Sequence, residues 1–213
     1  MGLSEKKILI VDDDEAVRDS LRALLMSAGF SVCDFGSARA VLDAGAIEGG
    51  CLIADIRMPD MDGLELQEEL NRRGSEWPVI VVTGHGDVPL AVRAMKAGAV
   101  DFIEKPYDDD VLLEAVRRAV VSRPRKLEVT DTDKDSKARL AALTARERDV
   151  LGHVIAGRPN KLIAFELGIS PRTVEIHRAH LMEKMCVKSL PELVRLALVA
   201  GIEPAPATRE QTN

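Results

Sequence analysis

The chain has 213 residues, of which 46% are apolar and 30% are charged, a composition typical of a globular protein. No apolar run approaches the ~18 residues of a membrane-spanning helix, and the N-terminus has no signal-peptide core, so we expect a cytoplasmic protein with no membrane partner. Residues 1–120 hold 13 Lys and Arg against 23 Asp and Glu, a net of −10, whereas residues 141–201 hold 9 against 6, a net of +3. An acidic half joined to a mildly basic half suggests two domains with different tasks, with nucleic acid a candidate partner for the second.

The cysteines give no sign of a redox or metal site. Cys33, Cys51 and Cys186 are odd in number, scattered and without metal-ligand spacing. Cys33 and Cys51 lie in strand-like apolar runs, where a free cysteine packs as a small apolar side chain. Reduced thiols in a reducing compartment are therefore expected.

The first 120 residues read as five units in which a strand is followed by a helix. Apolar runs typical of buried strands include Ile8–Val11, Cys51–Ala54, Val79–Val82 and Phe102–Ile103. Amphipathic patterns predict helices over residues 15–28, 37–45, 63–73, 88–97 and 109–121. Strands that alternate with helices predict an α/β fold with a parallel sheet.

Reactive side chains follow four of these strands, at the point where each strand ends. They are Asp12 and Asp13, Asp55, Thr83, and Lys105. In an open parallel sheet, ligands bind at the carboxyl ends of the strands where strand order reverses, so these groups should converge on one crevice. A carboxylate can attack a phosphoryl group when a cation masks the repulsion between the two anions, and we assign that role to Asp55.

The other four groups complete a metal-assisted phosphoryl site. Asp12 and Asp13 would supply oxygen ligands to Mg²⁺, which accepts one or two carboxylates while keeping several waters; Mn²⁺ is an alternative. Lys105 would neutralise one phosphoryl oxygen, and the Thr83 hydroxyl would donate a hydrogen bond to another.

The second half has a different pattern. Ser122–Lys137 is polar and contains Pro124, so residues 1–121 are assigned to the first domain and residues 122–140 to a linker. Residues 141–201 predict a small all-α domain of four helices, and residues 202–213 a disordered tail. The helix signals are a capping box at Thr144–Glu147, Asn160 as the cap of a second helix, a Ser170-Pro171 start of a third helix running to about Met185, and a fourth helix over Pro191–Ala200.

The strand-end residues stand in motifs that resemble the receiver domain of two-component response regulators, and more closely its FixJ group. The motifs are Val11-Asp-Asp-Asp-Glu15, Asp55-Ile-Arg-Met-Pro-Asp60, Thr83-Gly-His-Gly-Asp-Val-Pro89 and Ala94-Met-Lys-Ala-Gly-Ala-Val-Asp-Phe-Ile-Glu-Lys-Pro106. The resemblance implies a flavodoxin-like five-stranded receiver that accepts a phosphoryl group on Asp55 from a sensor histidine kinase, FixL-like for this group. It places Mg²⁺ on Asp13, Asp55 and the Arg57 carbonyl, with Asp12 bound through water, and it implies a cis Lys105-Pro106 bond.

The same resemblance implies a switch and a dimer face. Many receivers carry a switch Tyr where this chain has Phe102, which has no hydroxyl, so packing must act with Thr83 to drive the change. The implied dimer face consists of Val88, Val92, Met95, Phe102 and Ile103. For Val88 and Val92, a place in the core is an equally open interpretation.

The C-terminal helices resemble the NarL/LuxR-type DNA-binding domain with its helix-turn-helix. This resemblance rests on three segments: Leu143-Thr-Ala-Arg-Glu147, Asn160-Lys161 and Ile169-Ser-Pro-Arg-Thr-Val-Glu-Ile-His-Arg178. On the third helix, Val174, Leu181 and Met185 should face the core. The expected DNA contacts are Lys161, Arg172, Thr173, Glu175, His177, Arg178, Lys184 and Lys188, with Arg178 and Glu175 as base readers and most of the others on phosphates. His177 and His180 are three residues apart, which leaves a metal pair open, although no further ligands support it.

The sequence hypothesis is a transcription factor, and not an enzyme, that a sensor kinase activates. Phosphorylation would drive homodimerisation and promoter binding, and by the FixJ resemblance would activate nitrogen-fixation genes through RNA polymerase. One alternative is an aspartyl-phosphate phosphohydrolase of the haloacid-dehalogenase type, but Arg57 stands where those enzymes need a second Asp. Another is a constitutive DNA-binding protein or scaffold with a silent receiver, against which the intact set of five strand-end groups argues.

Overall fold

The computed structural model describes residues 7–44, 50–84, 88–121, 138–187 and 189–206. The chain forms two compact units. Unit 1 comprises Met1–Gly86 and Ala97–Lys126, and unit 2 comprises Asp87–Lys96 and Leu127–Asn213. Most of the predicted linker and the last seven residues of the chain lie outside the described ranges. No helix within the described ranges has the length and apolar character required to cross a membrane.

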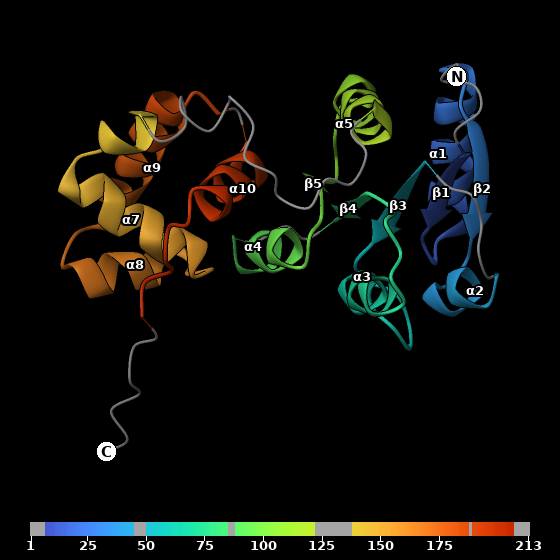
Figure 1. Ribbon diagram of the computed structural model, residues 1–213, viewed down its shortest axis with the longest axis horizontal. Helices are drawn as coiled ribbons and strands as arrows, with labels where there is room; N and C mark the ends of the chain where they lie inside the picture. Colours follow the sequence, from blue (N-terminus) through green and yellow to red (C-terminus); the bar gives the residue numbers. More distant parts are fainter. Residues whose placement is uncertain (1–6, 45–49, 85–87, 122–137, 188, 207–213) are drawn as a thin grey trace. The chain divides into compact units, whose positions relative to one another are not determined.

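Unit 1 is built on a parallel sheet of five strands, as the sequence predicted (Figure 1). The strands are β1 (Lys7–Val11), β2 (Ser31–Phe35), β3 (Cys51–Asp55), β4 (Val79–Thr83) and β5 (Asp101–Glu104), in the spatial order β2-β1-β3-β4-β5. Every residue of β3 and β4 is buried, which explains why these strands read as unbroken apolar runs. Strand order reverses between β1 and β3, where open sheets of this type bind their ligands.

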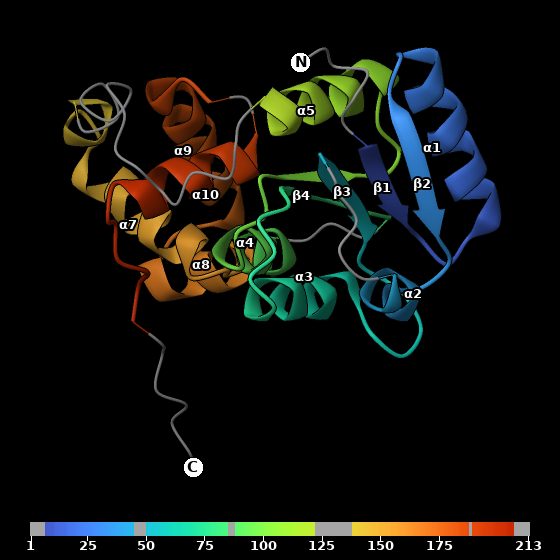
Figure 2. The ribbon, with the colours of Figure 1, turned by 45° about the vertical axis from the view of Figure 1, so that its right-hand side comes forward.

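Four helices of unit 1 cover the two faces of this sheet. They are α1 (Glu15–Ser27), α2 (Ala38–Asp43), α3 (Gly63–Arg72) and α5 (Asp109–Val121). Figure 2 shows α1 and α5 on one side of the sheet and α2 and α3 on the other. On the first side, Leu25 of α1 and Val116 of α5 share an apolar cluster with Ile53 of β3. Asp14, Ser37 and Asp62 cap the first three helices through their side chains.

Unit 2 is a bundle of helices. It contains α4 (Val88–Lys96), α7 (Ala145–Ile155), α8 (Asn160–Leu167), α9 (Pro171–Met185) and α10 (Leu190–Val199). Its core includes Val154, Val174, Leu181 and Met185, so the predicted inward stripe of the third C-terminal helix is confirmed. The Thr144–Glu147 capping box and the Ser170-Pro171 start are also confirmed. Helix α4, assigned to the first domain from the sequence, packs against α10 and α7 and is grouped with unit 2.

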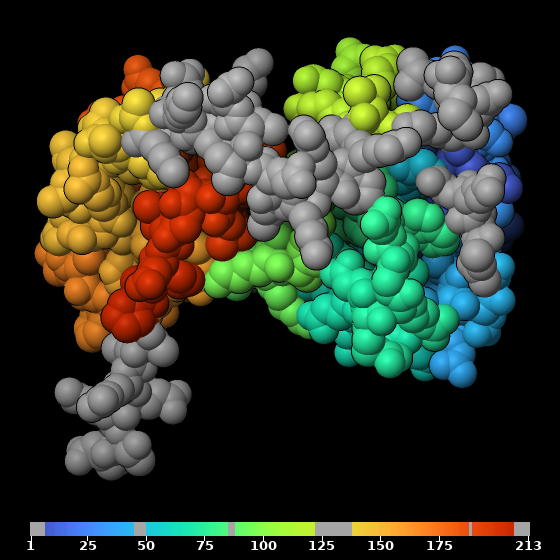
Figure 3. Space-filling view, viewed as in Figure 1, coloured from blue at the N-terminus to red at the C-terminus, as the bar shows by residue number. Residues whose placement is uncertain are grey.

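Two predictions for unit 2 need correction. Asn160 does not cap α8: Pro159 holds the cap position without a side-chain hydrogen bond, and Asn160 is the first helical residue. The predicted disordered tail begins at residue 202, but residues 202–206 are ordered across α7, where Ala205 N donates to Gly152 O (2.9 Å). The red segment in Figure 3 follows this path over the yellow and orange helices.

Candidate phosphoryl site and nucleic-acid interface

A lysine joins two aspartates at the point where the strand order reverses. Lys105 Nζ lies 2.8 Å from Asp12 Oδ2 and 2.9 Å from Asp55 Oδ1. Val11 pairs with Ala54 across β1 and β3, so the residues that follow them, Asp12 and Asp55, emerge side by side. Both aspartates are buried, at 4% and 7% exposure. The structure therefore brings three of the five predicted groups into direct contact.

The protonation of this cluster follows from burial and charge. Burial raises the pKa of Asp55, while the hydrogen bond and charge of Lys105 oppose that rise. Burial alone would lower the pKa of Lys105, but its hydrogen bonds to Asp12 and Asp55 outweigh burial and raise it. A cationic lysine thus holds two buried carboxylates close together. The Arg57 backbone N–H also donates to Asp55 Oδ2 (2.6 Å).

The remaining predicted residues line the same sheet edge. Thr83, the last residue of β4, is fully buried, and its carbonyl accepts from Lys105 N (2.7 Å). Asp13 is exposed and follows Asp12 in the loop before α1. Phe102, on β5, is half-buried. The Lys105-Pro106 bond is cis, as the family resemblance implied.

The acidic groups suit a small, hard cation. Within the described ranges, no three His, Cys, Asp or Glu side chains form a metal-ligand cluster. Mg²⁺ does not require one, because it commonly binds one or two carboxylates and keeps several waters. Two buried carboxylates, an exposed third one and the carbonyl of Arg57 are hard oxygen donors of the right kind, and Lys105 already shows that the pocket accommodates a positive charge.

A tight loop supports Asp55 from behind. Gly63 N donates to Ile56 O (3.0 Å), which brings the start of α3 against the end of β3. A Cβ at Gly63 would lie 2.2 Å from the Asp55 carbonyl oxygen, so only glycine fits there without a backbone shift. The role of Gly63 was not predicted from the sequence, although Gly63 stands three residues after the Asp55–Asp60 motif.

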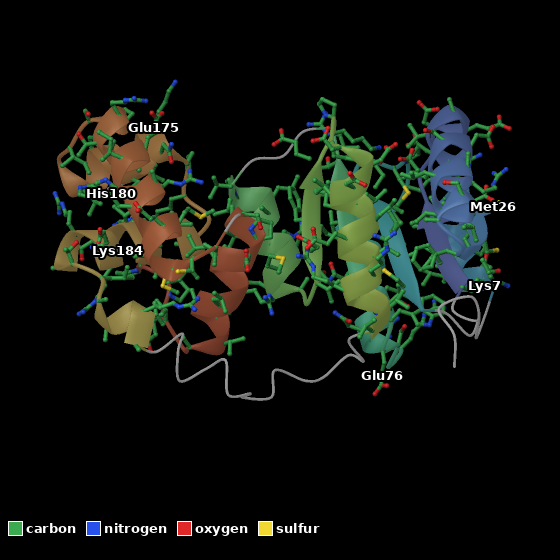
Figure 4. All side chains as sticks on the ribbon, turned by 90° about the horizontal axis from the view of Figure 1, so that it is seen from above. Lys7, Met26, Glu76, Glu175, His180 and Lys184 are labelled. Atoms are coloured by element: carbon green, nitrogen blue, oxygen red, sulfur yellow. The ribbon has the colours of Figure 1, made fainter. Side chains whose placement is uncertain are left out.

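Helices α8 and α9 of unit 2 form the helix-turn-helix. Gly168, in the left-handed conformation, ends α8, and Ser170 starts α9. The predicted DNA contacts on the open face of these helices are only partly exposed. Lys161, Arg172, Glu175 and Lys184 are exposed, Thr173, His177 and Arg178 are half-buried, and Lys188 lies outside the described residues. Figure 4 shows Glu175, His180 and Lys184 along α9.

Three of these cations already have protein partners: Arg172 pairs with Glu175 on the same helix (Nη1 to Oε2, 3.0 Å), and the other two bind residues of other helices. Arg178 Nη1 donates to Asn160 Oδ1 (2.7 Å), which joins α9 to α8, and burial lowers the pKa of Arg178. Lys184 Nζ lies 2.8 Å from Glu147 Oε2. With the backbone N–H of Thr144, this hydrogen bond lowers the pKa of Glu147 to about 2. These links between helices were not predicted from the sequence.

Part of the predicted dimer face packs inside the protein. Val92 and Met95 are buried on α4, and Ile103 is buried on β5. Val88 is half-buried and packs against the core of unit 2. Core packing thus accounts for most of these side chains in this structure.

Two family models match the chain. The response regulator receiver domain matches residues 8–117, and the bacterial regulatory proteins of the luxR family match residues 141–197. The chain is a response regulator of the luxR type. This class consists of transcription factors that join a receiver to a DNA-binding domain, and its members are not enzymes.

Full-length relatives share both parts of this response regulator. It is 53% identical over 197 residues to the transcriptional regulatory protein FixJ of Azorhizobium caulinodans, covering 92% of this chain and 93% of the relative. It is 45% identical to the response regulator protein TmoT of Ectopseudomonas mendocina, covering 92% and 90%. Among solved structures, full-length FixJ from B. japonicum has 51% identity and a TM-score of 0.51, with 92% and 98% coverage.

Proposed function

We propose that a sensor histidine kinase phosphorylates Asp55 of this response regulator. The observation that carries the proposal is the Asp12–Lys105–Asp55 cluster at the sheet edge. An Asp55 carboxylate oxygen would form a bond to phosphorus while the bond between phosphorus and the kinase histidine nitrogen breaks. The nitrogen keeps the electron pair of the broken bond, and the histidine leaves as a neutral imidazole when its other ring nitrogen carries a proton.

The groups around Asp55 would bind the three phosphoryl oxygens. Lys105 is close enough to move its hydrogen bond from Asp55 Oδ1 to the new anion. Thr83, at the end of the neighbouring strand, would donate its hydroxyl to a second oxygen. Mg²⁺ on Asp13, Asp55 and the Arg57 carbonyl, with Asp12 behind a water, would mask the repulsion between the carboxylate and the phosphoryl group.

Phosphorylation would then change the population of two receiver states. The phosphoryl group adds a charge of roughly −1.5 to −2 and strong acceptor oxygens. Moving a population from 1:99 to 99:1 requires about 5.5 kcal/mol of differential stabilisation. New hydrogen bonds to Thr83 and Lys105, with inward packing of the half-buried Phe102, would supply it. The proposed active form is a homodimer through Val88, Val92, Met95, Phe102 and Ile103. The rearrangement would have to expose the buried members of this face, Val92, Met95 and Ile103.

The dimer would bind promoter DNA through paired α9 helices. Arg178 and Glu175 are proposed to read bases, while Lys161, Arg172, Thr173, His177, Lys184 and Lys188 contact phosphates. A single domain of net charge +3 should bind weakly, so occupying two half-sites raises the affinity. Bound in this way in the cytoplasm, the dimer would activate transcription by RNA polymerase.

The relatives suggest two alternative sets of regulated genes, and we propose the set that the FixJ resemblance implies. The FixJ relatives favour nitrogen-fixation or microaerobic genes and a FixL-like kinase. The TmoT and TodT relatives, which carry other names at 45% and 44% identity, support a different set of regulated genes as the alternative. Chromatin immunoprecipitation of the wild type and the D55N variant in the native host decides this. Phosphorylation-dependent peaks at nitrogen-fixation promoters support the first choice, and peaks only elsewhere contradict it.

The activation step itself is testable with the full chain. Analytical ultracentrifugation with acetyl phosphate and Mg²⁺ should show a dimer for the wild type and a monomer for D55N. Selection from a random-sequence duplex library should then recover paired half-sites only with the phosphorylated wild type. Equal dimerisation and equal DNA binding by D55N would contradict the proposal.

A further inference from the structure

Arg18 of α1 reaches back to the loop that carries Asp13. Its Nη1 donates to Asp12 O (2.8 Å) and to Asp13 O (3.1 Å). These two carbonyls belong to the peptide groups on either side of the Asp13 Cα. Because the orientation of those two peptide planes sets the direction of the Cα–Cβ bond, one guanidinium nitrogen fixes the direction in which the Asp13 carboxylate leaves the backbone.

The orientation of the Asp13 side chain depends on the Arg18 hydrogen bonds more than that of Asp12 does. Asp12 is buried, its Oδ2 is paired with Lys105, and its Oδ1 accepts from Asp14 N (2.9 Å). Asp13 is exposed, so packing does not hold its side chain. Arg18 is the side chain that bonds to both peptide groups flanking it.

Arg18 is in turn held by the end of β2. The Arg18 side chain is 15% exposed, and its Nε lies 3.5 Å from Asp34 Oδ2. Arg22 binds the same carboxylate in a bidentate manner, with Nε 3.0 Å from Oδ1 and Nη2 2.8 Å from Oδ2. Gly36 sits over the guanidinium, since a Cβ there would lie 3.6 Å from Arg18 Nη1. Asp34 thus forms an ion pair with Arg18, whose buried Nε has no hydrogen-bond partner among the described residues, while the ion pairs of Arg22 go to Asp34 and Asp19.

We propose that Arg18 is a positioning residue for the cation-binding loop and that Asp34 orients it. Arg18 would act on Mg²⁺ affinity through the direction of Asp13, without contacting the metal or the phosphoryl group. This inference rests on the proposed function, in which the pocket binds Mg²⁺. It predicts a sign opposite to that of simple electrostatics, because removing a nearby positive charge should by itself strengthen the binding of a cation.

The test is isothermal titration of the unphosphorylated full chain with MgCl₂, comparing the wild type with R18Q, R18K, D34N and R22Q. Removing a group that orients a metal ligand typically weakens affinity by 10–100-fold, so R18Q should raise the Mg²⁺ dissociation constant about tenfold. D34N should raise the Mg²⁺ dissociation constant less, and the dissociation constant of R18K should lie between those of R18Q and the wild type. R22Q, the matched control that removes a charge from the same network, should change it less than twofold. Urea unfolding without Mg²⁺ checks that all variants are folded.

A kinetic measurement separates positioning from general damage. At saturating Mg²⁺, R18Q should be phosphorylated by acetyl phosphate at the wild-type rate, with only the Mg²⁺ concentration for half-maximal rate increased. An unchanged or lower Mg²⁺ dissociation constant in R18Q would overturn the inference, as would an equal loss in R22Q. Failure of the wild type itself to bind Mg²⁺ would instead contradict the proposed function.

Discussion

Lys105 Nζ and Asp55 Oδ1 lie 2.9 Å apart, although the two residues are fifty positions apart in the chain. Two parallel strands that end at the same sheet edge bring them together, and Asp12 completes the cluster from a third strand. The lysine offsets the repulsion that two buried carboxylates would otherwise exert on each other. With the lysine cationic and both aspartates ionised, the cluster of three residues keeps a net charge of −1, which favours the binding of a cation before phosphoryl transfer.

Removing the lysine should expose that repulsion. The K105M variant leaves Asp12 and Asp55 without a cation, and we expect it to lose about 2 kcal/mol of unfolding free energy at pH 7, less than for a fully buried pair. The pKa of Asp55 should rise further, so the variant should become more stable as the pH falls from 7 to 5. Urea titrations at both pH values, with and without Mg²⁺, measure this.

Added Mg²⁺ should stabilise K105M more than the wild type, because the metal replaces the lost charge. The K96M variant, which removes an exposed lysine, serves as control. A K105M protein that is as stable as K96M at pH 7 and gains nothing from Mg²⁺ would show that Lys105 does not offset the repulsion between Asp12 and Asp55.

Gly63 should tolerate no side chain. G63A places a Cβ 2.2 Å from the Asp55 carbonyl, and the backbone must shift, at a cost of about 2 kcal/mol. The shift should also slow phosphorylation of Asp55. The contrast is G152A on α7, where the new Cβ meets its nearest atom at 3.6 Å and the higher helix propensity of alanine should stabilise by up to ~1 kcal/mol. Thermal unfolding should show a lower melting temperature for G63A and a higher one for G152A, and a G63A protein as stable as the wild type would contradict the close approach.

Glu147 should stabilise unit 2 in a pH-dependent way. Its pKa is lowered to about 2, chiefly by the hydrogen bond from Lys184, so its contribution is complete above its ordinary pKa and is lost as the pH falls through 2. E147Q should cost about 2 kcal/mol at pH 7. The difference from the wild type should shrink between pH 4.5 and pH 2. Urea titrations followed by circular dichroism measure it, with E183Q on the exposed side of α9 as control; a difference that does not vary with pH would refute the ion pair.

Asn160 should matter through Arg178. N160A leaves the half-buried guanidinium without its 2.7 Å acceptor, which should cost about 1–2 kcal/mol of stability. It should also relax base discrimination by the phosphorylated protein, because Arg178 loses its fixed orientation. The readout is the consensus selected from a random duplex library, compared with that of K161A, which should weaken binding to all sequences equally. An unchanged consensus sequence for N160A would show that Asn160 does not influence how Arg178 recognises bases.

Sequence patterns predicted the sheet, the strand-end groups and most helix starts, because these depend on neighbouring residues. Asp12, Asp55 and Lys105 could be placed together because strand ends of a parallel sheet share one edge. Asn160 was misassigned because an Asn side chain near a helix start can either cap the helix or accept a hydrogen bond from another element. Here it accepts from Arg178, and that contact depends on how α8 and α9 cross, which the sequence does not reveal. The Arg18 bonds were invisible for a similar reason, since a long side chain that binds backbone carbonyls leaves no sequence signature.

The most direct test of the central claim is the intact mass of the protein after incubation with acetyl phosphate and Mg²⁺. The wild type should gain one phosphoryl group, and the gain should disappear in D55N and when Mg²⁺ is withheld. A wild type that accepts no phosphoryl group from acetyl phosphate or from a sensor histidine kinase, or a D55N variant that is modified equally, would contradict the assignment of Asp55 as the phospho-acceptor.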